Sequence, residues 1–155
     1  MTNDFSCSRR WRARSVSVLL SSSDPGELGP RRGAKDAITL LDALVDGPQE
    51  PEVHALALWT VIDANTHLGV DEARARRYLA RAAPHLAASQ EVRLNAIAAL
   101  IELGDHEAAL GVVRSAAKAE APGIGALVHA FQTLKVFEPI RGDERFIAAA
   151  FLAEP

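Results

Sequence analysis

Four basic side chains on one predicted helix have the clearest potential for chemistry. Arg74, Arg77, Arg81 and His85 follow one another at spacings of three, four and four residues. Because each residue of an α-helix turns the chain by about 100°, these spacings place all four within about 80° of one face. Such a strip would bind carboxylates or phosphate through charge-assisted hydrogen bonds. The alternative interpretation is a solvated charged face with ion pairs inside the helix.

A second pair, Asp63 and His67, lies four residues apart and therefore on one helical face. A carboxylate and an imidazole can together ligate a metal or transfer a proton. A metal site needs three or four ligands, however, and the chain has neither an H-E-x-x-H motif nor paired cysteines. The sequence therefore predicts no metal, no cofactor and no catalytic residue. The other histidines, which we expect at the surface, are His54, His85, His106 and His129.

Capping and turn residues divide the chain after residue 33 into predicted helices. Asp71, Ser89 and Asp105 each precede a helical segment, where their side chains can accept hydrogen bonds from the first backbone N–H groups. Gly69 and Gly104 stand where a left-handed residue would end a helix. The expected helices cover residues 34–45, 51–68, 72–87 with a kink near Pro84, 90–103, 106–120, 124–137 and 144–152.

The second and fourth predicted helices match at a constant offset of 39 residues. Each is apolar except for a narrow polar stripe, which on the fourth helix consists of Glu91, Asn95 and Glu102. A helix of this kind must be covered on several sides, and neighbouring repeats would cover it as in a solenoid. We accordingly expect Trp59 in the core. The matching pairs are Glu52 and Glu91, Val53 and Val92, Ala57 and Ala96, Val61 and Leu100, Ile62 and Ile101, and Asp63 and Glu102.

The 39-residue period and the pattern E-V-R-x-x-A-I-x-x-L-I-x-L-G over residues 91–104 resemble HEAT-like α-helical repeats. The resemblance covers residues 34–121. The segment G-D-H-E-A-A-L at 104–110 and the closing segment 137–146 are similar to tetratricopeptide-type proteins, in which a late proline ends a helix and a phenylalanine packs on the core. Both resemblances imply a superhelical surface that binds other macromolecules, and neither implies a particular partner.

Composition and charge favour packed helices and argue against a nucleic-acid partner. Hydrophobic residues make up 48% of the chain and aromatic residues 5%, and the abundant alanine lets helices approach closely. Residues 1–33, which we expect to be a flexible basic tail and linker, carry a net charge of +3, within an overall charge of −3. The acidic remainder does not suit a phosphate backbone. The lone Cys7 and the lack of a long apolar stretch predict a cytoplasmic protein without a membrane span.

The predicted fold is all-α, a short right-handed α–α superhelix of HEAT-like helix pairs over residues 34–155. The predicted function is a protein-interaction module, a scaffold or adaptor that binds an acidic or mixed partner in a groove between residues 72–87 and 106–120. Two alternatives stay open, an enzyme or ligand-binding protein on such a scaffold and an accessory subunit or terminal fragment of a larger repeat protein. Homo-oligomers could form through the end faces. The predicted contact residues are Arg74, Arg77, Arg81, His85, Arg114 and Lys118.

Overall fold

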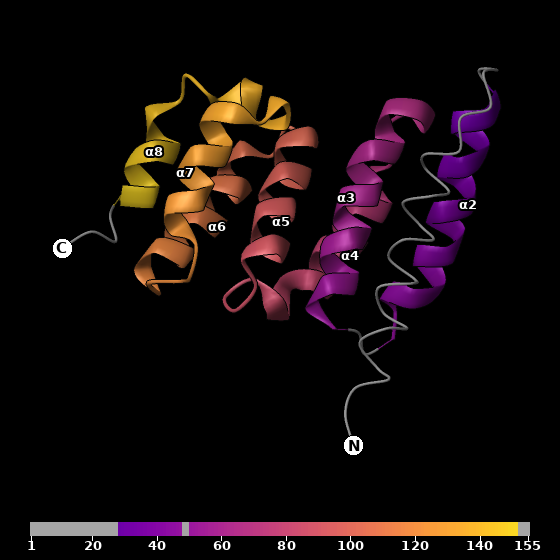
Figure 1. Cartoon of the computed structure of the whole chain (residues 1–155), viewed down its shortest axis with the longest axis horizontal. Coiled ribbons are helices and arrows are strands. Elements are labelled where there is room, and N and C mark those ends of the chain that lie inside the picture. The colour runs from indigo at the N-terminus through magenta and orange to yellow at the C-terminus, as the bar shows by residue number, and fades with distance from the viewer. Residues whose placement is uncertain (1–27, 48–49, 152–155) are drawn as a thin grey trace.

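The computed structural model describes residues 28–47 and 50–151, and all regular secondary structure in these residues is helical. The helices form a row that follows the chain, from α2 at one end to α8 at the other (Figure 1). The predicted all-α fold is confirmed at this level, and the superhelical HEAT-like form stays a prediction. The helices are α2 (Leu28–Val45), α3 (Pro51–Leu68), α4 (Glu72–Ala82), the 3-10 helix η1 (Ala83–His85), α5 (Gln90–Glu102), α6 (His106–Lys118), α7 (Ile124–Thr133), the 3-10 helix η2 (Lys135–Ile140) and α8 (Glu144–Phe151).

The local sequence explains most of the helix ends. The side chains of Asp71, Ser89 and Asp105 accept hydrogen bonds from the backbone N–H three residues further on, at 3.0, 3.2 and 3.2 Å. Gly69 and Gly104 follow the ends of α3 and α5 with φ of 83° and 73°, a backbone conformation that costs glycine nothing. The predicted caps and stops are therefore confirmed at these five positions.

Four predicted boundaries are wrong by two residues or more. The third predicted helix ends at Ala82 and is followed by η1 to His85, short of residue 87, and the fifth ends at Lys118, short of residue 120. The first helix begins at Leu28 and not at residue 34, so part of the expected linker is helical. The sixth helix ends at Thr133 and not at 137, because Leu134 is extended and turns the chain so that Phe137 packs into the core. The predicted tail before Leu28, with Cys7, lies outside the described residues.

Helix α5 lies at the centre of the molecule, packed against α3 on one side and α6 on the other. Several apolar positions 39 residues apart are buried on both α3 and α5, as are Ala57 with Ala96 and Val61 with Leu100, whereas Trp59 is exposed and its match Ala98 is buried. The two helices that the offset relates thus lie side by side with matching sides covered. Their membership of a known repeat family stays a prediction.

One buried amide fixes how α5 packs against α3. Asn95, which belongs to the polar stripe expected on this helix, is buried and donates its Nδ2–H to the carbonyl of Ala55 at 2.8 Å. A buried amide without a partner would be costly, so this bond favours one register of the two helices. Glu91 and Glu102, the other members of the stripe, are exposed.

Three phenylalanines close the C-terminal end of the core. Phe131 of α7 contacts Phe137 of η2 and Phe146 of α8, with ring centroids 5.1 and 5.9 Å apart and the rings edge to face. All three side chains are buried. Edge-to-face pairs of this kind add to the free energy of area burial. Phe146 thus packs on the core as the closing segment of the sequence predicts.

Candidate functional site

An uncharged groove of about 410 Å³ lies between η1 and α6, the two regions from which the sequence predicts a groove. None of its lining residues is ionisable, and most are alanine, glycine or serine. A Cβ added at Gly111, on the α6 side, would meet no other atom within 4 Å, so the groove is open there. Concave apolar surfaces of this size are where proteins take up ligands or partner side chains. The lining residues are Ala83, Leu86, Ala87, Ala108, Gly111, Val112, Ser115, Ala116 and Ala119.

The groove exists because α6 has two uncharged faces. One face packs on the core through residues such as Leu110 and Val113, which are fully buried. The groove face carries Ala108, Gly111 and Ser115, which are exposed and yet bear no charge. The exposed side of a surface helix is normally charged or strongly polar. This departure marks the groove face of α6 as a surface that another molecule can cover.

Lys118 and Arg114 stand on the flank of this groove face. Helical geometry places Lys118 about 90° around α6 from the middle of the groove face, and Arg114 about 130° away. Both are exposed. Within residues 28–47 and 50–151 neither forms a recorded ion pair, whereas Glu107 on the same flank binds Arg145 of α8 at 2.6 Å. Lys118 is therefore the cation best placed to reach a ligand in the groove.

Three arginines of α4, Arg74, Arg77 and Arg81, point to carboxylates in and just after α2 and not into the groove. Arg77 Nη2 lies 2.6 Å and Arg74 Nε 3.4 Å from one oxygen of Asp42, and Arg81 Nε lies 3.4 Å from Asp46. The strip predicted from the sequence is thus assembled on one face, as its spacing requires. Its charges are matched by carboxylates of the chain itself, so an acidic partner would have to displace them.

Asp42 also accepts a hydrogen bond from a buried hydroxyl group of α4. Tyr78, whose side chain is buried, donates its O–H to Asp42 Oδ1 at 2.6 Å. Burial, and then this hydrogen bond, raise the pKa of the Tyr78 hydroxyl above its ordinary value. The Arg77 guanidinium lies 5.6 Å from the centre of the same ring. One carboxylate of α2 therefore organises three side chains of α4, and the contact is structural.

Two histidines meet where α3 begins and η1 ends. The rings of His54 and His85 stack with centroids 4.9 Å apart. His54 is only 4% exposed, and its Nδ1 has no hydrogen-bond partner in the described part of the chain. The surface position predicted for His54 is therefore wrong, because η1 folds back over the start of α3. Burial, with the nearby charges of His85 and Arg81, lowers the pKa of His54.

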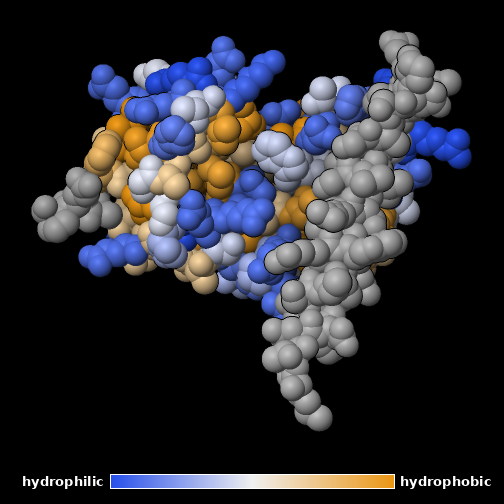
Figure 2. All heavy atoms as spheres, in the orientation of Figure 1, coloured by the Kyte–Doolittle hydropathy of each residue, from blue (hydrophilic) through white to orange (hydrophobic). Residues whose placement is uncertain are grey.

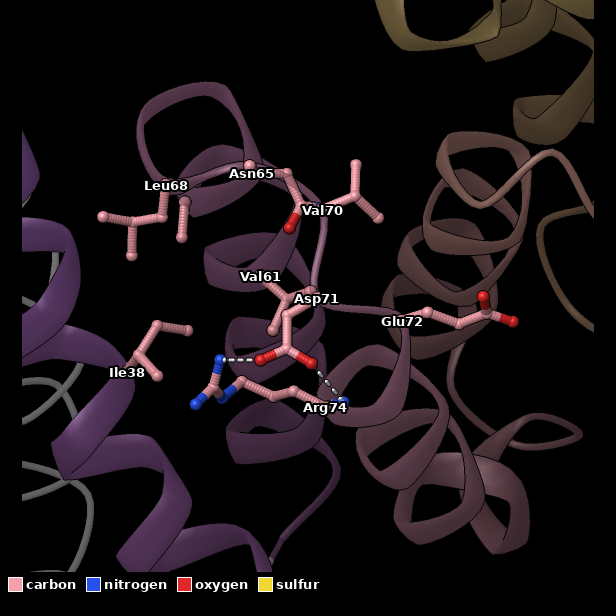
Figure 3. A pocket seen from close by; sticks show the side chains of 10 residues that line it. Ile38, Val61, Asn65, Leu68, Val70, Asp71, Glu72 and Arg74 are labelled. Atoms are coloured by element: carbon pink, nitrogen blue, oxygen red, sulfur yellow. Dashed lines mark hydrogen bonds and ion pairs between the residues drawn. The ribbon is translucent and has the colours of Figure 1, made fainter.

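A second hollow, of about 400 Å³, lies where α2, the end of α3 and the start of α4 meet. Figure 3 shows the Asp71 carboxylate near its centre, bonded both to the backbone N–H and to the guanidinium of Arg74. Ile38 and Leu68 line its apolar side, and Glu72 points away from it (Figure 3). Its charged groups already satisfy one another, so we assign no ligand to this hollow.

Arg93 is a structural residue that supports the groove, and the sequence alone does not identify it. Its guanidinium is fully buried and donates to three backbone carbonyls, those of Leu86, Ala87 and Pro122, at 2.9, 2.8 and 2.6 Å. The first two carbonyls follow η1, at a helix end that leaves them without partners. The third belongs to the connection between α6 and α7. Arg93 thus joins two connections, and since Leu86 and Ala87 line the groove, it also holds one groove wall.

Trp59 and the pair Asp63 and His67, all on α3, are the remaining residues for which the sequence makes a prediction. Trp59, expected in the core, is 46% exposed on the outer side of α3, so that prediction is wrong. Asp63 and His67 are half-exposed on the same helix, and the backbone carbonyl of His67 accepts a hydrogen bond from Arg31 Nε at 3.1 Å. In residues 28–47 and 50–151 no group of three or more histidine, cysteine, aspartate or glutamate side chains could hold a metal ion.

No protein-family model, curated protein or solved structure matches this chain. None of the helices in the described ranges is long and apolar enough to cross a membrane. On the face drawn in Figure 2, apolar side chains reach the surface among hydrophilic ones over the half of the row that contains α5 to α8. The function of the protein is therefore inferred from its own surfaces.

Proposed function

We propose that this protein is an interaction module that binds an apolar segment of a protein partner in the groove between η1 and α6. The observation that supports this proposal is the exposed, uncharged and concave face of α6, with about 410 Å³ of open volume beside it. Apolar surface left in a concave site, next to polar flanks, is typical of interaction sites. Small lining residues allow a partner backbone to approach α6 closely.

The partner that suits this groove is an amphipathic helix with acidic residues beside its apolar face. Helix-in-groove recognition uses apolar side chains spaced three or four residues apart, which the small residues of α6 can accommodate. Lys118 flanks the groove without an ion pair to any described residue, so a carboxylate of the partner would gain a new contact there. Arg74, Arg77 and Arg81 are secondary contacts in this proposal, because Asp42 and Asp46 already hold them.

A labelled amphipathic peptide, with leucines on one face and glutamates beside them, tests the proposal by fluorescence anisotropy. Gly111→Leu places a side chain in the open groove and should weaken binding at least tenfold, about 1.4 kcal/mol. Gly111→Ala is the matched control, since it adds one methyl group and should bind within about threefold of the wild type. Lys118→Glu should weaken binding and reduce its salt dependence. Equal binding by the wild type and Gly111→Leu, or no binding by the wild type, would contradict the proposal.

The two alternative functions have no observation of their own in their favour. Catalysis on a helical scaffold would require a reactive group beside a cavity, and none of the buried polar side chains of the described segments lines the groove between η1 and α6. These side chains are His54, Thr60, Arg93 and Asn95. An accessory subunit of a larger repeat protein would stack through the end faces of the row, so the groove variants would leave its association unchanged.

A further inference from the structure

The outer face of α3 carries an exposed tryptophan between two acidic residues. Glu52, Leu56, Trp59 and Asp63 follow one another at spacings of four, three and four residues, and therefore line one narrow strip of the helix. Trp59 is 46% exposed, although its ring is the largest apolar side chain on α3. Exposed tryptophans are frequent among the residues that dominate binding at protein interfaces. We call these four residues the Trp59 strip.

The Trp59 strip and the groove of α6 are complementary in shape and in charge. The strip has one large aromatic ring, whereas the groove has only Leu86 and Val112 as side chains larger than serine. Glu52 and Asp63 form no recorded ion pair with any described residue, and the same holds for Lys118 beside the groove. An apolar knob with acidic flanks thus matches an apolar hollow with a basic flank.

We infer that the Trp59 strip of one copy docks in the α6 groove of a second copy of the chain. This inference depends on the proposed function, because it names the occupant of the same groove. Trp59 enters between η1 and α6 beside Gly111, and Asp63 or Glu52 approaches Lys118. The strip and the groove are different surfaces, so the contact is heterologous and each added copy leaves one strip and one groove free. Such a contact produces a ring or an open chain of copies.

Sedimentation velocity over a concentration series tests the inference with two complementary variants of the full chain. The wild type should associate, and Trp59→Ala and Gly111→Leu should each associate about 30-fold more weakly, as expected when a central interface residue is lost. A mixture of the two variants should form a one-to-one dimer and no larger species, because only one intact strip and one intact groove remain. Trp59→Phe keeps an aromatic ring and is the conservative control. Circular dichroism confirms that each variant keeps its helices.

Three results would overturn self-docking. The first is a wild type that stays monomeric at about 100 μM, a concentration far above the micromolar dissociation constants of weak specific complexes. The second is association that is unchanged in both variants. The third is a mixture of the two variants that stays monomeric. The acidic peptide described above separates this failure from that of the proposed function. A monomeric wild type that still binds the peptide, and loses it in Gly111→Leu, would overturn self-docking alone.

Discussion

Arg93 provides the sharpest test of how the connections between these helices are held in place. Its guanidinium has three backbone carbonyls as partners, and within residues 28–47 and 50–151 it has no carboxylate partner. Burial accordingly lowers the pKa of Arg93, which still leaves the group charged at neutral pH. Arg93→Met keeps a long unbranched side chain and removes every donor. The three carbonyls would then be buried without partners, or the two connections would open to water.

The cost of this substitution follows from the three bonds that it removes. A hydrogen bond to a charged group contributes about 1.5–3 kcal/mol, so three give an upper limit of about 9 kcal/mol. The variant no longer buries a charge, which recovers part of this sum. We expect the free energy of unfolding to fall by about 3–5 kcal/mol, toward the lower end of what three buried carbonyls without partners cost at about 1–3 kcal/mol each. For a chain of this size that corresponds to a decrease in Tm of about 10–15 °C.

Urea unfolding followed by circular dichroism measures this loss. Arg93→Lys should lie between the wild type and Arg93→Met, because a single ammonium group cannot span three carbonyls as the guanidinium does. Arg114→Met is the matched control, since Arg114 is exposed and should contribute less than about 0.5 kcal/mol. If Arg93→Met were as stable as Arg114→Met, the three carbonyls would not depend on the guanidinium, and this reasoning would be refuted.

Two further predictions concern backbone conformation and pH. Gly123→Ala should lower stability by about 1–2 kcal/mol, because Gly123 has a φ of 83° and its new Cβ would overlap a neighbouring side chain, whereas Gly111→Ala should raise it by about 0.5–1 kcal/mol. If urea unfolding showed the same change in stability for Gly123→Ala and Gly111→Ala, both backbone predictions would be contradicted. The lowered pKa of buried His54, beside His85 and Arg81, means that the folded state binds fewer protons, so stability should fall as pH decreases below about 6.5. His54→Phe should flatten this decrease between pH 7.5 and 5.5, and an unchanged slope would exclude His54 as its origin.

Features that depend on neighbouring residues were predictable from the sequence. Asp71, Ser89 and Asp105 cap their helices because a side-chain oxygen on the residue just before a helix lies within reach of the backbone N–H three residues further on. The same is true of the glycine stops, since the left-handed conformation is a property of the residue. The offset of 39 residues matched Ala57 with Ala96, Val61 with Leu100 and Ile62 with Ile101, and these apolar pairs are buried on both helices.

Features that depend on distant partners were not predictable in the same way. Arg93 looks like an exposed charge on a helix, and its burial depends on the carbonyl of Leu86, 7 residues before it, and on that of Pro122, 29 residues after it. His54 is buried only because η1 returns over α3. Trp59 is different, since a signal was present: it shares a face with Glu52 and Asp63, and acidic residues mark the solvent side of a helix.

The position of α2 changes how the function of this protein should be tested. Asp42 and Asp46 now bind the guanidinium groups of Arg74, Arg77 and Arg81 at 2.6–3.4 Å. Changing these arginines to glutamate would place a carboxylate opposite each aspartate. Like charges at that distance would weaken the docking of α2 on α4, so a loss of binding in that variant would report on folding as well as on recognition. A variant at Gly111 changes the groove and removes no side-chain contact, because glycine has no side chain and the space for a new Cβ is open. Binding that survives the groove variant and fails in the arginine variant would therefore exclude the α6 groove, and would assign recognition to the α4 arginines or to the docking of α2 on them.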